Sequence, residues 1–281
     1  MASGTDVTSP YGFLPINLIG GQVFAGSTRM YPIQYGYDTN IFYGDFVKVV
    51  RGSATRVSIG AATNSNAVTG VFVGCSYTDP VTKDKRFSQY YPASTLAGDA
   101  VAYVVDDPDT VFKAAVCSAT TVMASGAYAL VGTNLSAVDN TGNVNTGNSK
   151  NAILAPSATP ATSILPLRCV GVVPETSLSY TATGSSSSTT LTLTGSGAPA
   201  ALPVGTSVAY YASNGQLIET GSFLSVAAAA GDTSLTLNAA IAVPGSVTAI
   251  PSASTVVFTI YRELLVKLNV LTHGYYSSVT A

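Results

Sequence analysis

The sequence predicts an all-β protein in which a β-barrel or β-tulip-like main domain carries an inserted small β-sandwich-like module. Two observations carry this prediction. Short apolar runs with the period of a strand alternate with turns rich in Gly, Asn and Asp along most of the 281 residues. Glu occurs three times and Lys six times, so the charged stripe of a solvent-exposed helix could hardly be formed. We therefore expect short strands and very little helix.

The first two thirds of the chain predict most of the main domain. Residues 1–10 are polar and are expected to form a flexible arm. An Asn-, Gly- and Thr-rich stretch at 139–150 has no apolar period and predicts a long exposed loop. Strand patterns occupy the segments around this stretch, at residues 13–22, 29–37, 40–50, 55–62, 67–77, 87–94 and 165–173, with weaker patterns at 126–131 and 152–154.

Residues 98–116 read GDAVAYVVDDPDTVFKAAV, an apolar run that stops at acidic residues and then resumes. Asp106, Asp107, Pro108 and Asp109 supply turn chemistry, so the segment predicts a β-hairpin. Three acids in one turn could also offer oxygen ligands to Ca²⁺. The segment lacks an EF-hand pattern and Pro108 limits how the carboxylates converge, so a hydrogen-bonded turn or an interface contact is favoured.

The composition changes between residues 180 and 254. This stretch contains no Lys or Arg, and its only acids are Glu219 and Asp232. Such a shift marks a module boundary. The strand patterns resume at 256–260 and 264–270, so we predict a β module at 180–254 inserted into a main domain formed by 11–179 plus 255–281.

A T-x-L-T-L-type alternation occurs twice within this module, at residues 187–197 and 231–241. In a strand, residues two apart lie on the same face. Each copy therefore predicts a strand with a pair of leucines on one face, Leu191 and Leu193 in the first copy and Leu235 and Leu237 in the second.

The charge balance argues against several partners. Twelve Lys and Arg face 14 Asp and Glu, and no cation cluster is available to neutralise the phosphates of a nucleic acid. No apolar stretch approaches the length of a membrane-spanning helix. The N-terminus lacks the basic region and apolar core of a signal peptide. We therefore expect synthesis in a cytoplasm, with neither nucleic acid nor membrane as a partner.

Candidate catalytic and metal-binding residues are few. His273 is the only histidine and is expected to be a satisfied or solvent-exposed side chain rather than a general base. No G-x-S-x-G elbow is present. Cys75, Cys117 and Cys169 lie alone in apolar runs and predict buried free thiols, with a disulfide as the alternative. The sequence predicts no enzyme, no cofactor, no metal and no catalytic residue.

Two further groups of residues are candidates for contacts with other molecules. The loop cations Lys83, Lys85 and Arg86 are interrupted by Asp84 and predict a solvated loop. Tyrosines concentrate in the first third of the chain, where they fit either a protein interface or the rim of a β core equally well. These tyrosines are Tyr31, Tyr35, Tyr37, Tyr43, Tyr77, Tyr90 and Tyr91.

Several short motifs follow one another in a characteristic order. They are P-Y-G-F at 10–13, Gly-Gly at 20–21, G-D-F-V at 44–47, G-V-F-V-G at 70–74, Y-P-A at 91–93, A-Y-V-V-D-D-P-D-x-x-F at 102–112, L-R-x-x-G-x-V at 167–173 and V-K-L-N at 266–269. In this order they resemble the motifs of tailed-bacteriophage head decoration, or cement, proteins. The resemblance spans about 1–179 and 255–281, and the shorter relatives lack the stretch 180–254.

The resemblance implies a virion protein on the outer surface of the assembled phage capsid, which cements neighbouring subunits of the major capsid protein. Residues 1–50 would grip the shell, the 180–254 module would face outward, and the protein would form a homodimer or homotrimer. The resemblance brings no catalytic residue. The alternative is a host-surface or glycan-binding adhesin or fibre component of the virion. A glycan depolymerase is the weakest alternative, because no two carboxylates pair convincingly in the sequence.

Overall fold

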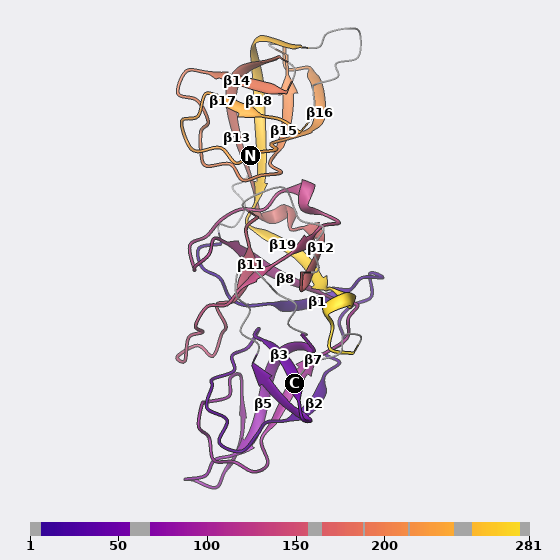
Figure 1. The fold of residues 1–281 in the computed structure, drawn as a ribbon, viewed down its shortest axis with the longest axis vertical. Helices are drawn as coiled ribbons and strands as arrows, with labels where there is room; N and C mark the ends of the chain where they lie inside the picture. The colour runs from indigo at the N-terminus through magenta and orange to yellow at the C-terminus, as the bar shows by residue number, and fades with distance from the viewer. Residues whose placement is uncertain are drawn as a thin grey trace.

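The computed structural model describes residues 7–56, 68–156, 165–187, 189–212, 214–238 and 249–275. Strands make up 49% of the chain and helices 4%, which confirms the predicted all-β fold. Figure 1 shows the strands in three tiers along the long axis of the molecule. We call them the lower, middle and upper sheets.

The lower sheet is curled like a barrel, and its strands follow the order β2-β7-β5-β3-β4, with β6 paired to β5. A bridge between Ile33 and Ala54 links the chain after β2 to β4, across the two edges of the sheet. Its interior holds Phe72, Tyr91 and Val104. The strands are β2 (Arg29–Pro32), β3 (Phe46–Val50), β4 (Ser53–Arg56), β5 (Gly70–Thr78), β6 (Lys85–Ser88) and β7 (Val101–Val105).

The middle sheet is built around β8, which pairs with β19 on one side and with β1 and β11 on the other. Its core contains Phe13, Phe112 and Leu264, and it continues without a break into Phe46 and Val71 of the lower sheet. The strands are β1 (Leu14–Leu18), β8 (Thr110–Cys117), β9 (Asn134–Leu135), β10 (Ala137–Val138), β11 (Ala152–Leu154), β12 (Leu167–Val172) and β19 (Glu263–Leu268).

The upper sheet follows the order β16-β15-β18-β13-β14-β17 and surrounds a core of its own. A bridge between Leu224 and Leu237 connects the residues that follow its two edge strands, so the sheet curls back on itself. The strands are β13 (Ser177–Ser187), β14 (Thr190–Thr194), β15 (Ser207–Tyr211), β16 (Leu217–Phe223), β17 (Ser234–Thr236) and β18 (Ala249–Tyr261).

The two T-x-L-T-L copies are neighbouring strands of this upper sheet. β14 pairs antiparallel with β17, and Leu191 lies opposite Leu235. The leucine pairs predicted to share a face, Leu191 with Leu193 and Leu235 with Leu237, are all buried in the upper core. The prediction of two strands with apolar leucine faces is confirmed.

The predicted hairpin at 98–116 is wrong. The strands β7 and β8 do form on either side of the acidic turn, but β7 pairs with β2 and β5 in the lower sheet. β8 belongs to the middle sheet. The turn at 106–109 therefore carries the chain from one sheet to the next, because both strands find better partners elsewhere.

The weak strand predicted at 126–131 is also corrected. Residues Tyr128–Leu130 form a short 3₁₀ helix, η1, whose Leu130 is buried in the middle core. Gly126 alone makes a strand-like bridge, with Tyr261. Leu130 reaches the core from a helical turn. The apolar residues of this segment therefore do not need the alternating pattern of a strand to be buried.

The upper sheet uses residues from 177 to 261, so it begins before and ends after the predicted module at 180–254. Its strand β18 includes Val256, Phe258 and Ile260, which pack in the upper core rather than with the sheets below. The division of the chain into domains stays a prediction. Among the described residues, no helix has the length and hydropathy needed to cross a membrane.

The separate upper core leads to a first prediction. Leu191 is fully buried there, and replacing such a leucine with alanine removes its contacts and leaves a cavity. We expect Leu191→Ala to lower the free energy of unfolding by about 2–5 kcal/mol in urea titration. Leu217→Ala, at a half-exposed position of the edge strand β16, is the matched control. Equal effects of the two substitutions would contradict the assigned core.

Candidate functional site

The motifs at 10–13 and 44–47 meet at the joint between the lower and middle sheets. Gly12 and Gly44 both have positive φ, +88° and +91°. A Cβ added to Gly12 would lie 3.0 Å from the Gly44 Cα, and one added to Gly44 would lie 2.8 Å from the Phe13 nitrogen. Only glycine fits a positive φ together with this backbone approach. The neighbouring rings of Phe13 and Phe46 pack with their centroids 4.3 Å apart.

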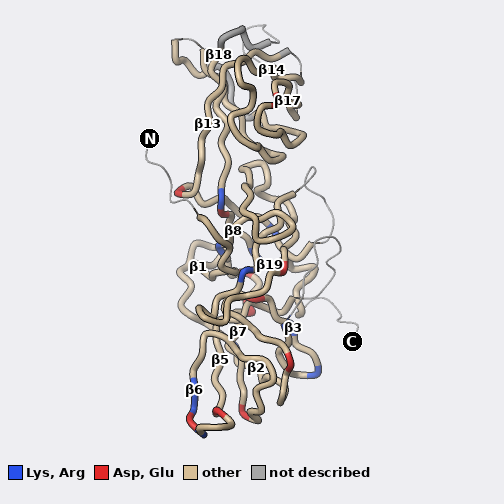
Figure 2. The backbone as a smooth tube through the Cα atoms, turned by 90° about the vertical axis from the view of Figure 1, so that its left-hand side faces the viewer, with Lys and Arg blue, Asp and Glu red and all other residues tan. Residues whose placement is uncertain are grey.

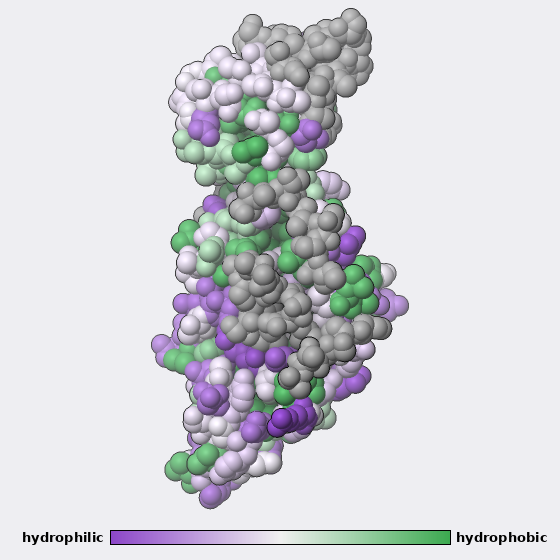
Figure 3. All heavy atoms as spheres, in the orientation of Figure 1, coloured by the Kyte–Doolittle hydropathy of each residue, from purple (hydrophilic) through white to green (hydrophobic). Residues whose placement is uncertain are grey.

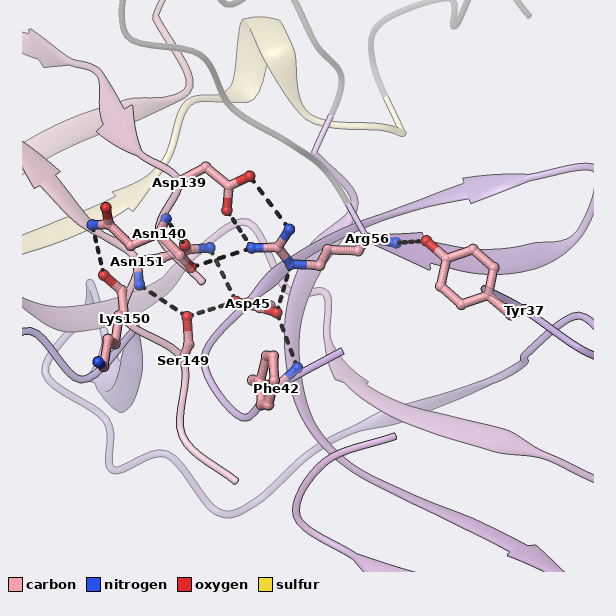
Figure 4. A network of polar contacts seen from close by, with 9 residues as sticks. All are labelled: Tyr37, Phe42, Asp45, Arg56, Asp139, Asn140, Ser149, Lys150 and Asn151. Carbon is pink, nitrogen blue, oxygen red and sulfur yellow. Dashed lines mark hydrogen bonds and ion pairs between the residues drawn. The ribbon is translucent and has the colours of Figure 1, made fainter. Parts of the chain in front are cut away.

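Asp45 lies at the centre of a buried polar network in this joint (Figure 4). Its Oδ2 accepts hydrogen bonds from the Arg56 Nε at 2.8 Å and from the Phe42 backbone N–H at 2.9 Å. Its Oδ1 accepts from the Ser149 hydroxyl at 2.6 Å and from the Asn151 amide at 3.1 Å. Both carboxylate oxygens are therefore fully engaged by donors from the protein.

Arg56 extends the network across the joint. Its guanidinium group binds the Asp139 carboxylate with two nitrogens, in the forked geometry that arginine offers to carboxylates. Its backbone N–H donates to the Tyr37 hydroxyl at 2.9 Å. Arg56 belongs to the end of β4, whereas Asp139 follows β10. A single side chain thus connects the lower sheet to the loop that leaves the middle sheet.

The charges of the network are coupled. Burial raises the pKa of Asp45, and this outweighs the lowering by Arg56 and by the hydrogen bonds from Ser149 and Phe42. Burial lowers the pKa of Arg56, but Asp45 and Asp139 more than offset this and raise it overall. Arginine is charged at any physiological pH. The buried cation is therefore held between two carboxyl groups, and removal of either partner would leave an uncompensated charge.

The loop at 139–150 differs from its prediction. It was expected to be a long exposed loop, but Ser149 and the following Asn151 are buried and bind Asp45. Asn140 donates its side-chain amide to the Lys150 carbonyl at 3.0 Å, which ties the two ends of the loop together. Only the middle of the loop is exposed. Polar composition concealed this role, because a buried network uses the same residue types as a solvated loop.

The acidic turn forms a second polar cluster on the same joint. The Asp106 carboxylate accepts hydrogen bonds from the hydroxyls of Tyr31 and Tyr275, and Arg29 Nε lies 3.0 Å from it. The other two acids of the turn point to different partners. Asp107 accepts from the Asp109 backbone N–H at 2.8 Å, and Asp109 binds the Lys267 ammonium group at 3.1 Å.

The turn is therefore hydrogen-bonded, as favoured from the sequence. Within the described part of the chain, no group of three or more His, Cys, Asp or Glu residues is arranged to hold a metal ion. The calcium alternative has no support in this geometry, because each carboxylate is directed to its own protein partner.

His273 is fully buried, next to the Tyr31–Asp106–Tyr275 cluster. The chain around it forms a parallel bridge with Val68, in which the Gly274 N–H donates to the Val68 carbonyl. The His273 Nδ1 accepts from the Tyr275 backbone N–H at 3.3 Å. Burial lowers the pKa of His273, against the raising effect of Asp106. The C-terminal segment of the middle sheet is thus fastened to the lower sheet.

The N-terminal segment is fastened at the other end of the middle sheet. The Tyr11 hydroxyl donates to the buried Glu263 carboxylate, and the Lys113 ammonium lies 3.5 Å from the same carboxylate. Burial and Glu263 together raise the pKa of Tyr11. Pro10 is buried, and residues 1–6 of the predicted arm lie outside the described residues.

The other candidate residues serve the fold. The three cysteines are free and buried, which confirms their prediction. Burial raises the pKa of Cys75 to about 12 and of both Cys117 and Cys169 to about 11. A thiol with so high a pKa is a poor nucleophile at neutral pH.

Two of the three loop cations and most of the tyrosines also have partners within the protein. Lys85 binds Asp99 at 2.7 Å and Arg86 binds Asp79 at 2.8 Å. Tyr77 and Tyr91 pack edge to face in the lower core, so the core interpretation is confirmed for them. Tyr35 is exposed instead. For the tyrosines outside the core, the interface interpretation stays a prediction.

Comparison of the chain with protein-family models, with curated proteins and with solved structures finds no match. The geometry of the site describes a joint in which polar groups hold two sheets together and are engaged with one another.

The Asp45 network yields a second prediction. Arg56→Leu would leave the buried Asp45 carboxylate without its cation, so we expect a loss of about 3–5 kcal/mol in the free energy of unfolding. The double variant Asp45→Asn/Arg56→Leu removes both charges and should recover part of this loss. The control Lys85→Leu breaks an exposed ion pair and should change stability little. If the loss of stability in the double variant equalled the sum of the losses in the two single variants, the coupling between Asp45 and Arg56 would be contradicted.

The single histidine yields a third prediction. Because burial lowers the pKa of His273 below its ordinary value of 6.5, the folded protein keeps the ring neutral where the unfolded chain takes up a proton. The free energy of unfolding should therefore fall as the pH drops below about 6.5, until the folded pKa is reached. His273→Gln should flatten this part of the pH profile. Proton NMR of the single imidazole measures its pKa directly, and a value above 6.5 would contradict the prediction.

Proposed function

We propose that the protein is a virion structural protein that binds the outer surface of an assembled phage capsid and cements neighbouring major capsid subunits. One observation carries the proposal. The motifs that resemble decoration proteins lie far apart in the sequence, yet several of them build one joint. Gly12 of the P-Y-G-F motif lies against Gly44 of the G-D-F-V motif, and Lys267 of the last motif binds Asp109 of the acidic motif. That these motifs meet in one structural frame of this chain supports the proposal.

The mechanical character of this frame supports the proposal. The lower and middle sheets share one apolar core, and polar clusters around Asp45 and Asp106 cross-link them. A protein that bridges capsid subunits has to resist their relative movement, and a packed core deforms little. Many weak contacts, repeated over a capsid, then add to strong overall binding.

The distribution of charge supports an orientation on the particle. Figure 2 shows the Lys, Arg, Asp and Glu residues concentrated in the lower and middle sheets, with very few in the upper sheet. Residues 180–254 contain no Lys or Arg at all. Charged groups give a protein interface its specificity and register. The proposal therefore places the lower and middle sheets toward the shell and the upper sheet outward.

The fourth prediction tests this function. Heads of the encoding phage, assembled without the protein, are mixed with the purified full chain and sedimented. We expect the chain to bind up to a fixed ratio to the major capsid protein. We also expect it to raise the temperature at which the heads rupture, measured by release of packaged DNA.

Absence of both binding and protection would overturn the proposal. The adhesin alternative has its own readout, since it requires the full chain to bind host cells or a glycan array. Glycan binding without head binding would replace the cement function by the adhesin function.

A further inference from the structure

A cleft lies between the middle and upper sheets, where η1 faces β15 and β16. In Figure 1 these two strands stand directly above the magenta turn of η1. The cleft has a volume of about 360 Å³, which falls within the range of small-molecule sites. One wall is η1, whose Tyr128 is 61% exposed. The other wall is the outer face of the upper sheet. We call this space the η1 cleft.

A row of side chains in matching register crosses the outer face of the upper sheet at the cleft. Phe223 of β16 lies opposite Ser207 of β15, which lies opposite Thr259 of β18. Thr259 in turn lies opposite Ser179 of β13, and their hydroxyl oxygens are 3.4 Å apart. Residues directly opposite each other share a face of the sheet, and all four are half-buried or exposed. One ring and three hydroxyls therefore form a continuous row, whose first three residues line the cleft.

Backbone contacts hold the two walls of the cleft in place. A Cβ added to Gly205, just before β15, would lie 3.3 Å from the Ala129 Cβ, so η1 packs directly against this part of the upper sheet. The Gly126 and Tyr261 backbones exchange two hydrogen bonds, of 2.7 and 3.0 Å, which tie the chain before η1 to the end of β18. The cleft is therefore formed before any ligand arrives, and a preformed site loses less entropy on binding.

The lining of the cleft combines rings and hydroxyls without charge. None of its described residues is Lys, Arg, Asp or Glu, and Figure 3 shows few strongly hydrophilic side chains on the visible face of the upper tier. An anionic ligand would find no cation among these residues to bind it. A purely apolar ligand would leave the hydroxyls without hydrogen-bond partners, which costs free energy. The lining therefore fits a neutral ligand that has both apolar surface and hydroxyl groups.

Strand pairing at the cleft argues against an extended peptide as the ligand. β15 and β18 are each paired on both sides. At the outer edge of β16, the Phe223 N–H donates to the Asn238 side chain and the Phe223 carbonyl accepts from the Asn238 N–H. The strands that line the cleft therefore offer a peptide no open edge at this point for main-chain hydrogen bonds.

A sugar ring has the chemistry that the lining requires. Its faces carry C–H groups that pack on an aromatic ring, and its edge carries hydroxyls that exchange hydrogen bonds with serine and threonine. We propose that the η1 cleft binds a neutral saccharide, with the Tyr128 ring against the sugar face and Ser207 and Thr259 as hydrogen-bond partners. This binding activity is separate from the cement function and does not depend on it.

A glycan array tests the class of ligand. The full chain, displayed in many copies on fluorescent beads so that weak contacts add up, is applied to immobilised neutral hexose oligosaccharides and to sialylated and sulfated glycans. We expect binding to members of the neutral set. Absence of binding to the neutral set, or a preference for the anionic glycans, would overturn the proposal.

A substitution of the aromatic wall tests the site. The affinity of the full chain for a neutral oligosaccharide that binds on the array is measured by calorimetric titration. Tyr128→Ala removes the ring and should weaken binding about tenfold. Tyr35→Ala is the matched control, because Tyr35 is also 61% exposed but lies in the turn after β2, in the lower sheet. It should leave the affinity unchanged.

A rescue experiment tests the hydroxyls. Thr259→Val keeps the branched shape of the side chain but removes the hydroxyl, and should weaken binding about three- to tenfold. Thr259→Ser restores a hydroxyl and should recover most of the affinity. Melting temperatures establish that each variant is folded. Saccharide binding that neither Tyr128→Ala nor Thr259→Val weakens would overturn the assignment to the cleft. Since no heads are present in these experiments, failure of the cement function leaves their result intact.

Discussion

The lower and middle sheets depend on one buried carboxylate. Asp45 collects donors from three separate stretches of chain, namely the backbone of Phe42, the side chain of Arg56 and the side chains of Ser149 and Asn151. A buried charge is tolerated only when its partners are all in place. The two sheets therefore have to approach in a single register. The Gly12–Gly44 contact and the Phe13–Phe46 pair next to it require the same approach.

The sequence predicted features that lie within a single strand, and it missed the pairing of strands and the contacts between sheets. The leucine faces of the T-x-L-T-L strands were predicted because the period of two belongs to a single strand, and a shared face leads to a shared core. The hairpin at 98–116 failed because turn residues show where a chain reverses or bends, but not which strands pair. Strand pairing depends on competing partners, and β8 has better ones in β1 and β19.

The candidate site was the least predictable part for a related reason. Asp45, Arg56 and Asp139 are spread over three motifs or loops, and none of them is unusual in its own segment. The stretch at 139–150 has the composition of a solvated loop, and only contact with Asp45 distinguishes its buried end. The G-D-F-V motif at 44–47 was the available signal, since a glycine and an acid at the start of a strand fit a close backbone approach followed by a buried acceptor.

The upper sheet does not depend on the Asp45 network, because only a few connections join it to the middle sheet. At this waist β18 passes into β19 through Arg262, and the 3₁₀ helix η2 (Pro174–Thr176) leads into β13. The Gly126 and Tyr261 backbones bond to each other, and Arg262 donates to the Ala124 carbonyl at 3.1 Å. Clefts of about 360 and 470 Å³ lie at the waist. A unit with its own core and so narrow a connection can be added to a frame without disturbing the Asp45 joint.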